Sequence, residues 1–443
     1  MTEIDDSSRV QSPMRRVIGN FGFLMRGRGI AAVMTLGATA LAARSLGSAE
    51  FGRVILILTY ALLIRGLLKI RLFEAIVKFG VPSHDAGDHT TLRRLVHACK
   101  RVDHLTSIIA TVAAVLMAPF IGPLINLDQE HVVMLTGYSL VLLTSGVGTA
   151  NGLLRLFDQF DVLGRQMTIS PAIRLVGLGL ACWFDSPVIV FICIFALASV
   201  SEDLYLKWSG RREYLKRVGE PVKGENVGDA KLAEFPGLGR FLWITYWQSN
   251  VDLVPRQVSI MLAGYLLGPA EAGLLRLARQ FSTLLSKPAT LLRQVVFLDL
   301  TRSWNEKSDN FKLVTYRTAL LGGALGLCFV AAGYFFGDDF LRALVGEEFT
   351  AAAPVLTLML LAATFDLVAS SLRSAAYAMG KAGNVLRIYA VSAAIYLAFF
   401  LAFTSWLGLI GAGIAACIGT VVPPIAMSVL IHKSEHKSDV DSD

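Results

Sequence analysis

The chain has 443 residues, of which 54% are hydrophobic and only 17% are charged, whereas soluble domains average about 25% charged residues. Apolar blocks recur almost from end to end, which excludes an ordinary soluble protein, because a bilayer-spanning helix needs about 20 mostly apolar residues. The net charge of +7 would suggest nucleic-acid binding in a soluble protein. In a membrane protein, the distribution of basic residues first indicates which loops face the cytoplasm. No nucleic-acid partner is expected.

The hydropathy pattern predicts twelve transmembrane helices joined by mostly short connections. Their expected bounds are 18–43, 53–80, 103–125, 131–154, 166–185, 187–207, 241–266, 272–297, 315–336, 351–377, 384–404 and 408–431. Pro and Gly fall inside several spans, which membrane helices tolerate. The sequence therefore predicts an all-α polytopic membrane protein.

Basic residues concentrate in alternate connections. These connections hold Arg9, Arg15 and Arg16; Arg93, Arg94, Lys100 and Arg101; Arg155 and Arg165; Lys207, Arg211, Arg212, Lys216, Arg217, Lys223 and Lys231; Arg302, Lys307 and Lys312; Lys381; and Lys433 and Lys437. The intervening ones are short and poor in charge, with Arg44, Arg53 and Arg342 as the exceptions. The positive-inside rule then places both termini in the cytoplasm.

A polar, glycine-containing segment divides the spans into six and six. The expected domains are a cytoplasmic N-terminal tail at 1–17, an N-terminal lobe at 18–208, a cytoplasmic linker at 209–239, a C-terminal lobe at 240–431 and a cytoplasmic tail at 432–443. Because six is an even number, both halves enter the membrane in the same orientation.

A short motif marks the correspondence of the halves. "LGSAEFG" at 46–52 returns as "LGPAEAG" at 267–273, an offset of 221 residues. Each copy follows the first span of its half and opens the second. This position predicts two six-helix lobes that are parallel repeats, related by a pseudo-two-fold axis along the membrane normal.

An ordered set of motifs resembles a known family. "ARSLGSAEFG", "YLLGPAEAGLLRLARQ", "GLLRLFDQFD" and "EEFTAAAPVLTLMLLAATFDLVASSLRSAAYAMGKAG" are similar to the bacterial oligosaccharide flippases, the polysaccharide transport branch of the multidrug/oligosaccharidyl-lipid/polysaccharide exporter superfamily. The resemblance implies a non-enzymatic, two-lobed exporter in the bacterial cytoplasmic membrane. It would move a lipid-linked oligosaccharide, typically on undecaprenyl pyrophosphate, to the outer leaflet, beside membrane lipids and a polysaccharide polymerase or glycosyltransferases.

Several predicted spans carry basic residues at bilayer depth, where each charge costs about 2.5–3.5 kcal/mol unless it faces a cavity or a partner. In 272–297 they form a polar stripe, and at the 221-residue offset Arg65 and Lys69, which share a helical face, fall on Ser286 and Thr290. We expect a cationic cavity between the lobes that attracts an anionic pyrophosphate–sugar headgroup. Its predicted residues are Arg28, Arg65, Lys69, Arg256, Arg279 and Lys287.

Three acidic residues, Asp252, Asp366 and Glu74, are candidate sites for coupling transport to H+ or Na+. Arg71 and Lys78 offer Glu74 nearby partners and suggest a structural stripe. No GxxxxGK[ST] motif occurs in the sequence, so ATP hydrolysis within this chain is not expected. No other cofactor, catalytic residue or metal site is predicted.

A histidine-rich stretch follows the second predicted span. The spacing of His84, His89, His97 and His104 matches no standard metal site. Residues 90–102 are instead typical of an amphipathic helix lying at the membrane interface, with its basic residues toward the headgroups.

Two other functions fit parts of the pattern. An ion-coupled multidrug antiporter of the same fold would favour carboxylates in its cavity, whereas deep cations outnumber acids here. A membrane glycan polymerase or glycosyltransferase would need catalytic residues on an outward loop. The longest such loop, "GDDFLRALVGEEFT", has about fourteen residues. We interpret its acidic pairs as solvated residues at the ends of the loop.

Overall fold

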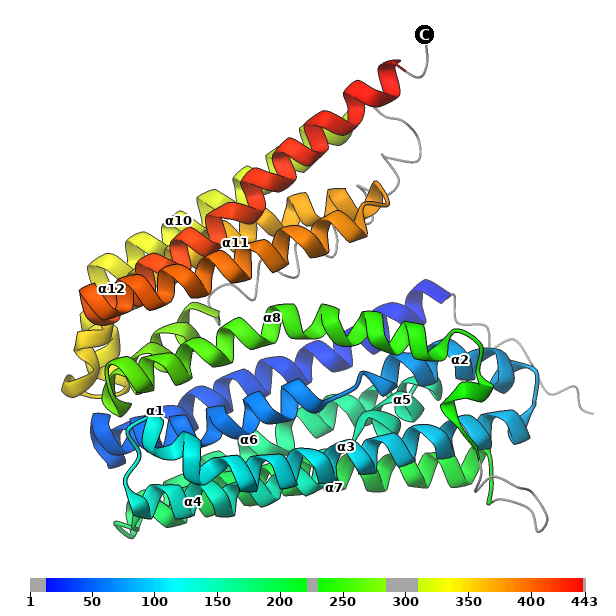
Figure 1. Ribbon diagram of the computed structural model, residues 1–443, viewed down its shortest axis with the longest axis horizontal. Coiled ribbons are helices and arrows are strands. Elements are labelled where there is room, and N and C mark those ends of the chain that lie inside the picture. Colours follow the sequence, from blue (N-terminus) through cyan, green and yellow to red (C-terminus); the bar gives the residue numbers. More distant parts are fainter. Residues whose placement is uncertain (1–12, 221–229, 284–309, 441–443) are drawn as a thin grey trace, which may run out of the picture. The chain divides into compact units, whose positions relative to one another are not determined.

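The computed structural model describes residues 13–220, 230–283 and 310–440, and every regular element in these ranges is a helix (Figure 1). The helices are α1 (Pro13–Leu68), α2 (Leu72–Asp85), α3 (His89–Leu124), α4 (Gln129–Ser139), η1 (Leu140–Thr144), α5 (Gly148–Leu156), α6 (Phe160–Trp183), α7 (Val188–Arg217), η2 (Leu232–Glu234), α8 (Leu238–Leu266), a helix over 269–283, α10 (Asn310–Leu344), η3 (Glu347–Ala352), α11 (Ala353–Ala378) and α12 (Ala382–Val440).

α12 holds two predicted spans, and α1 holds the first predicted span and the beginning of the second. The 56-residue α1 is interrupted at Gly47, where φ is 71°, and the 59-residue α12 is interrupted at Gly408, where φ is 59°. Glycine adopts positive φ without a steric cost. Both interruptions fall at or beside the predicted connections, 44–52 and 405–407. In the described residues, seven segments are long and apolar enough to cross a membrane, with the α1 and α12 segments counted once each.

The second predicted span, 53–80, is wrong as a continuous helix. α1 ends at Leu68 and α2 begins at Leu72, so Lys69 lies outside the helix that carries Arg65. The Tyr246 hydroxyl on α8 donates a hydrogen bond of 2.6 Å to the Leu67 carbonyl. This side chain satisfies one of the carbonyl groups that a helix end leaves without an intrahelical donor.

The fourth predicted span, 131–154, is also broken, between Thr144 and Gly148. The carboxylate of Asp103 on α3 accepts the backbone N–H groups of Gly148 at 3.2 Å and Thr149 at 2.6 Å. These are orphan donors in the first turn of α5. A buried acid from another helix therefore stabilises a helix start inside the predicted span.

Three expected surface segments belong to longer helices than predicted. The predicted interfacial helix at 90–102 is the beginning of a continuous α3, α7 runs on to Arg217, and α10 reaches Leu344 across most of the expected fourteen-residue loop. Packing explains α3: Leu92, Leu95 and Cys99 are fully buried in a core cluster rather than spread on a membrane surface.

The chain forms two compact units. Unit 1 comprises Met1–Ala42, Leu67–Met117 and Thr136–Trp247, and unit 2 comprises Ala43–Gly66, Ala118–Leu135 and Gln248–Asp443. The domain bounds expected from the sequence stay a prediction.

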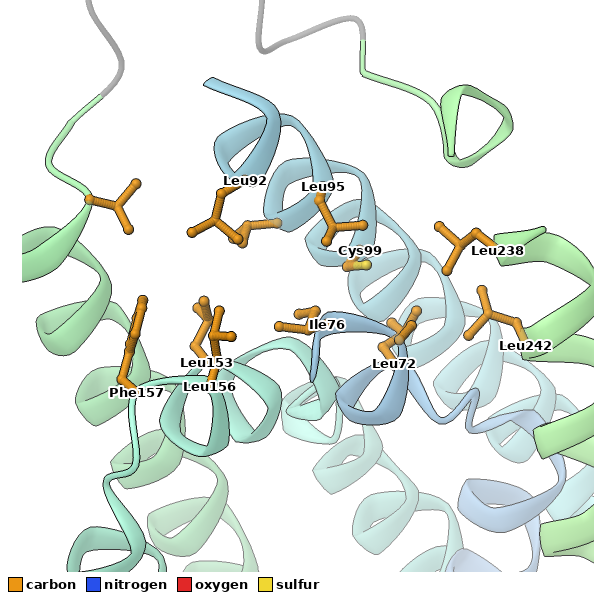
Figure 2. Packing of buried hydrophobic residues seen from close by; sticks show 13 residues of the cluster. Leu72, Ile76, Leu92, Leu95, Cys99, Leu153, Leu156, Phe157, Leu238 and Leu242 are labelled. Carbon is orange, nitrogen blue, oxygen red and sulfur yellow. The ribbon is translucent and has the colours of Figure 1, made fainter. Parts of the chain in front are cut away.

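The core of unit 1 joins α2, α3, α5 and the start of α8. Figure 2 shows the apolar side chains meeting between these helices, among them Leu72, Ile76, Leu95, Leu153 and Leu242. This cluster fixes the beginning of α3 against α5, which places the polar side chains of both helices.

The core of unit 2 joins α10, α11 and α12. Phe311, Leu372, Val385 and Met427 lie in one buried cluster with two alanines of α11. Small residues allow membrane helices to approach closely, and α11 buries Ser370, Ser371, Ser374, Ala375 and Ala376.

Candidate functional site

A cavity of about 360 Å³ lies within unit 2, between α8, the helix over 269–283, α11 and α12. Three residues predicted from the sequence line it: Arg256, Arg279 and Asp366. The other polar side chains of its described lining are Ser282, Thr283, Tyr389, Ser392, Tyr396 and Thr420. The lining thus combines two guanidinium groups, one carboxylate and several hydroxyls.

Arg279 joins three elements of this cavity. Its Nη1 donates to the Arg256 carbonyl at 2.6 Å and to Ser259 Oγ at 2.9 Å. Its Nη2 donates to the Tyr396 hydroxyl at 2.7 Å. The planar guanidinium therefore has a fixed orientation, and it links the Tyr396 hydroxyl of α12 to α8.

Prolines open backbone acceptors in the cavity wall. Pro423 has no N–H, so the Gly419 carbonyl receives no helical hydrogen bond from it. Ser392 Oγ donates to that carbonyl instead, at 2.6 Å. Pro255 similarly deprives the Val251 carbonyl of its helical donor, and both residues line the cavity. Hydroxyl side chains and residues with carbonyls freed by proline therefore line the same cavity.

Among the described lining residues, Arg256 carries the most accessible charge of this cavity. The Arg256 side chain is exposed, whereas Asp366 on α11 is half-buried. Within the described lining, these groups and Arg279 give one more positive than negative charge. Such a surface attracts anions, and its single carboxylate offers one place for a counter-cation.

The remaining predicted residues are not among the described residues that line this cavity. Arg28 is exposed on α1, Arg65 is half-buried in the last turn of α1, and Lys69 is exposed after that helix has ended. Arg65 belongs to unit 2 but is not among the residues that line its cavity. Lys287 and the side chain of Asp252 lie outside the described residues.

Glu74 has a local partner. Arg71 Nη1 lies 2.7 Å from Glu74 Oε1, so Arg71 is the partner among the two candidates, Arg71 and Lys78. Lys78 instead lies over the Phe241 ring, with its Nζ 4.4 Å from the centroid. The predicted three-residue stripe is therefore an ion pair beside a cation–π contact.

Sequence reasoning missed the α12 side of the unit 2 cavity. Tyr389, Ser392 and Tyr396 recur at spacings of three and four, which places their side chains on one helical face. The signal is present in the sequence, but the surrounding apolar residues indicate no more than a transmembrane span.

Comparison with known proteins identifies the family. Residues 17–297 match the family described as "Polysaccharide biosynthesis protein". The inner membrane protein YghQ of Escherichia coli (strain K12) is 23% identical over 339 residues, which cover 76% of this chain and 95% of YghQ.

Solved structures share the fold. Lipid II flippase MurJ, in an inward closed conformation, has a TM-score of 0.76 at 13% identity, over 93% of this chain and 87% of MurJ. A multidrug resistance MATE family transporter of the MOP superfamily, in an inward-facing conformation, has a TM-score of 0.71 at 13% identity, over 94% of this chain and 99% of the transporter.

These likenesses confirm the predicted fold class, an all-α polytopic membrane protein with about twelve spans in two six-helix lobes. They also confirm the resemblance that the sequence motifs indicated. The chain belongs to the polysaccharide biosynthesis protein family, and its fold is that of membrane transporters and flippases rather than of enzymes.

Proposed function

We propose that the protein is a flippase that moves a lipid-linked oligosaccharide of the undecaprenyl-pyrophosphate type across the bacterial cytoplasmic membrane by alternating access, for cell-surface polysaccharide export. Three comparisons support this proposal: the family description, the inner-membrane location in the name of YghQ, and the flippase activity in the name of MurJ. Both termini would lie in the cytoplasm, and a polysaccharide polymerase or glycosyltransferases would act beside the protein.

The observation that carries the proposal is the mixed lining of the unit 2 cavity. Guanidinium groups bind phosphate oxygens in a forked geometry, and hydroxyl and carbonyl groups suit sugar hydroxyls. Arg256 offers the exposed cation, and Arg279 holds the Tyr396 hydroxyl at the wall. The volume of about 360 Å³ is near the lower end of ligand pockets, about 300–1,000 Å³, and suits part of a glycan headgroup.

Coupling to H+ or Na+ belongs to the same proposal. Asp366 is the strongest of the three acidic candidates because it lines the unit 2 cavity beside the cations. Glu74 is already engaged by Arg71, and Asp252 remains a candidate from the sequence. Binding of a cation at Asp366 would change the net charge of the cavity and hence its affinity for an anionic headgroup.

A complementation experiment tests the flippase. In a strain that lacks the protein, surface glycan and accumulated lipid-linked glycan are measured for wild type, Arg256→Gln, Arg279→Gln and the double variant. Arg342→Gln is the matched control, because Arg342 lies at the end of α10, more than half exposed and outside the cavity lining. We expect the double variant to accumulate lipid-linked glycan while it remains in the membrane.

Normal glycan export by the double variant would contradict the role of the cavity. Drug susceptibility, measured in the same strains, separates the antiporter alternative. If the wild-type protein changes drug susceptibility but not glycan export, the chain is an antiporter rather than the proposed flippase.

A further inference from the structure

A second cavity, of about 650 Å³, lies within unit 1 between α3, α5 and α7, and we call it the α3–α7 cavity. Four basic side chains belong to its described lining, Arg93 and Lys100 from α3 and Lys207 and Arg211 from α7, among mostly apolar residues. His97 and His104 lie on the same turns of α3. Asp103 is the acidic residue of this described lining.

The carboxylate of Asp103 is already occupied by hydrogen bonds to the backbone. This residue is 5% exposed, and both its oxygens accept backbone N–H groups at the start of α5. Arg93, 9% exposed, donates from Nη2 to the Val218 carbonyl at 2.8 Å. Asp103 and Arg93 on the inner wall of the cavity therefore hold neighbouring backbone segments in place. Lys100, Lys207 and Arg211 make the outer part of the cavity cationic.

Apolar side chains continue the wall beside these cations. Leu204 and Trp208 line the cavity and are 52% and 58% exposed. They lie one helical turn apart on α7 and alternate with Lys207 and Arg211 in the same two turns. Tryptophan is enriched where the membrane meets water, so this edge suits a ligand with an anionic head and an aliphatic chain.

We infer that the α3–α7 cavity binds the phosphate headgroup of an anionic membrane phospholipid, as a site separate from the proposed transport cavity of unit 2. Ammonium and guanidinium groups bind phosphate through charge-assisted hydrogen bonds, and basic pockets between membrane helices hold such headgroups. The lipid chain lies along Leu204 and Trp208. A lipid bound here joins α3 to α7 and stabilises unit 1, because a ligand that binds only the folded state raises its stability.

Lipid-dependent thermal stability of the purified full-length protein tests this site. The probes are phosphatidylglycerol, cardiolipin, phosphatidylcholine and inorganic phosphate, each titrated into detergent. The wild type should be stabilised by the two anionic lipids and not by phosphatidylcholine or phosphate. Lys100→Gln/Arg211→Gln should bind the anionic lipids roughly 30-fold more weakly, at about 1 kcal/mol for each basic residue.

Arg101→Gln/Lys216→Gln is the matched control, because it removes two cations from the same two helices outside the cavity lining. It should keep wild-type lipid affinity. Equal losses in both double variants would show diffuse attraction and overturn the site. Equal stabilisation by phosphate alone, or by phosphatidylcholine, would overturn the assignment to an anionic lipid.

A second variant addresses the lipid chain and does not depend on charge. Trp208→Ala should weaken binding of long-chain phosphatidylglycerol while leaving a short-chain analogue unchanged. If both lipids bind to Trp208→Ala as to wild type, the proposed position of the chain along α7 is wrong.

Discussion

Gly52 and Gly273, the last residues of the two copies of the repeated motif, lie directly against each other in unit 2. A Cβ atom added to Gly273 would lie 3.0 Å from the Gly52 Cα, and one added to Gly52 would collide with the Pro269 backbone. The copies are therefore more than a mark of two corresponding halves. They form a glycine contact between the second part of α1 and the helix over 269–283, of the kind that allows membrane helices to approach closely.

Gly52→Ala should destabilise the folded protein by about 1–3 kcal/mol, the usual cost of overpacking. The new methyl group meets backbone atoms of Pro269, which cannot rotate away. Gly273→Ala should cost less, because its methyl group meets the Gly52 Cα at the edge of a tolerable distance. Gly137→Ala on α4 is the control, since nothing lies within 4 Å of its added Cβ. Thermal unfolding in detergent measures all three, and a Gly52→Ala midpoint equal to that of Gly137→Ala would refute the close contact.

The hydrogen bond from Arg279 to Tyr396 predicts energetic coupling between the two residues. Tyr396→Phe should cost about 1 kcal/mol, and Arg279→Gln more, because it loses charge-assisted hydrogen bonds. The double variant should cost less than the sum, because either change alone already breaks the shared bond at 2.7 Å. Unfolding free energies of the four proteins supply this cycle. Tyr265→Phe, at a tyrosine that is 53% exposed, is the control, and strict additivity would contradict the coupling.

The helices were predictable from the sequence, whereas two of their breaks were not. Length and hydropathy mark the spans because the bilayer imposes both, and Gly47 and Gly408 lie at or next to expected connections. The breaks after Leu68 and Thr144 depend on Tyr246 and Asp103. Each of these partners belongs to another helix, so a local pattern carries no sign of it.

The candidate site, too, could be predicted from the sequence only in part. Arg256, Arg279 and Asp366 were predicted because charges in apolar spans are conspicuous, and one cavity brings them together. The cations of the α3–α7 cavity were assigned to membrane topology, because Lys100 and Arg211 sit in a basic connection. The folded structure, and not the sequence pattern, shows that α3 and α7 place these cations around one cavity.

Neutralising Glu74 should have little effect, in contrast to Asp366. The Arg71 and Glu74 side chains are 41% and 27% exposed, and such ion pairs contribute at most about 1 kcal/mol. Glu74→Gln should therefore retain glycan export and its response to collapsed H+ or Na+ gradients. Asp366→Asn should lose that response while the protein remains in the membrane. If Glu74→Gln alone removes the gradient dependence, the coupling site lies at α2 instead of the unit 2 cavity.

The contact between Glu234 and Arg94 should open in acid. The Arg94 guanidinium donates to Glu234 at 2.7 Å and 3.1 Å, and with the Lys231 N–H it lowers the pKa of the Glu234 carboxyl below its usual range. Because the folded-state pKa is depressed, the contact stabilises η2 fully above the ordinary glutamate pKa of about 4.3. That stabilisation is lost as pH falls through the lowered value.

A nitroxide label at the exposed Ala233 should be immobile at neutral pH and become mobile in acid. In Glu234→Gln it should be mobile at every pH, and Asp185→Asn, in the turn before α7, should keep the wild-type profile. A label that stays immobile in acid would show that η2 is held by other contacts.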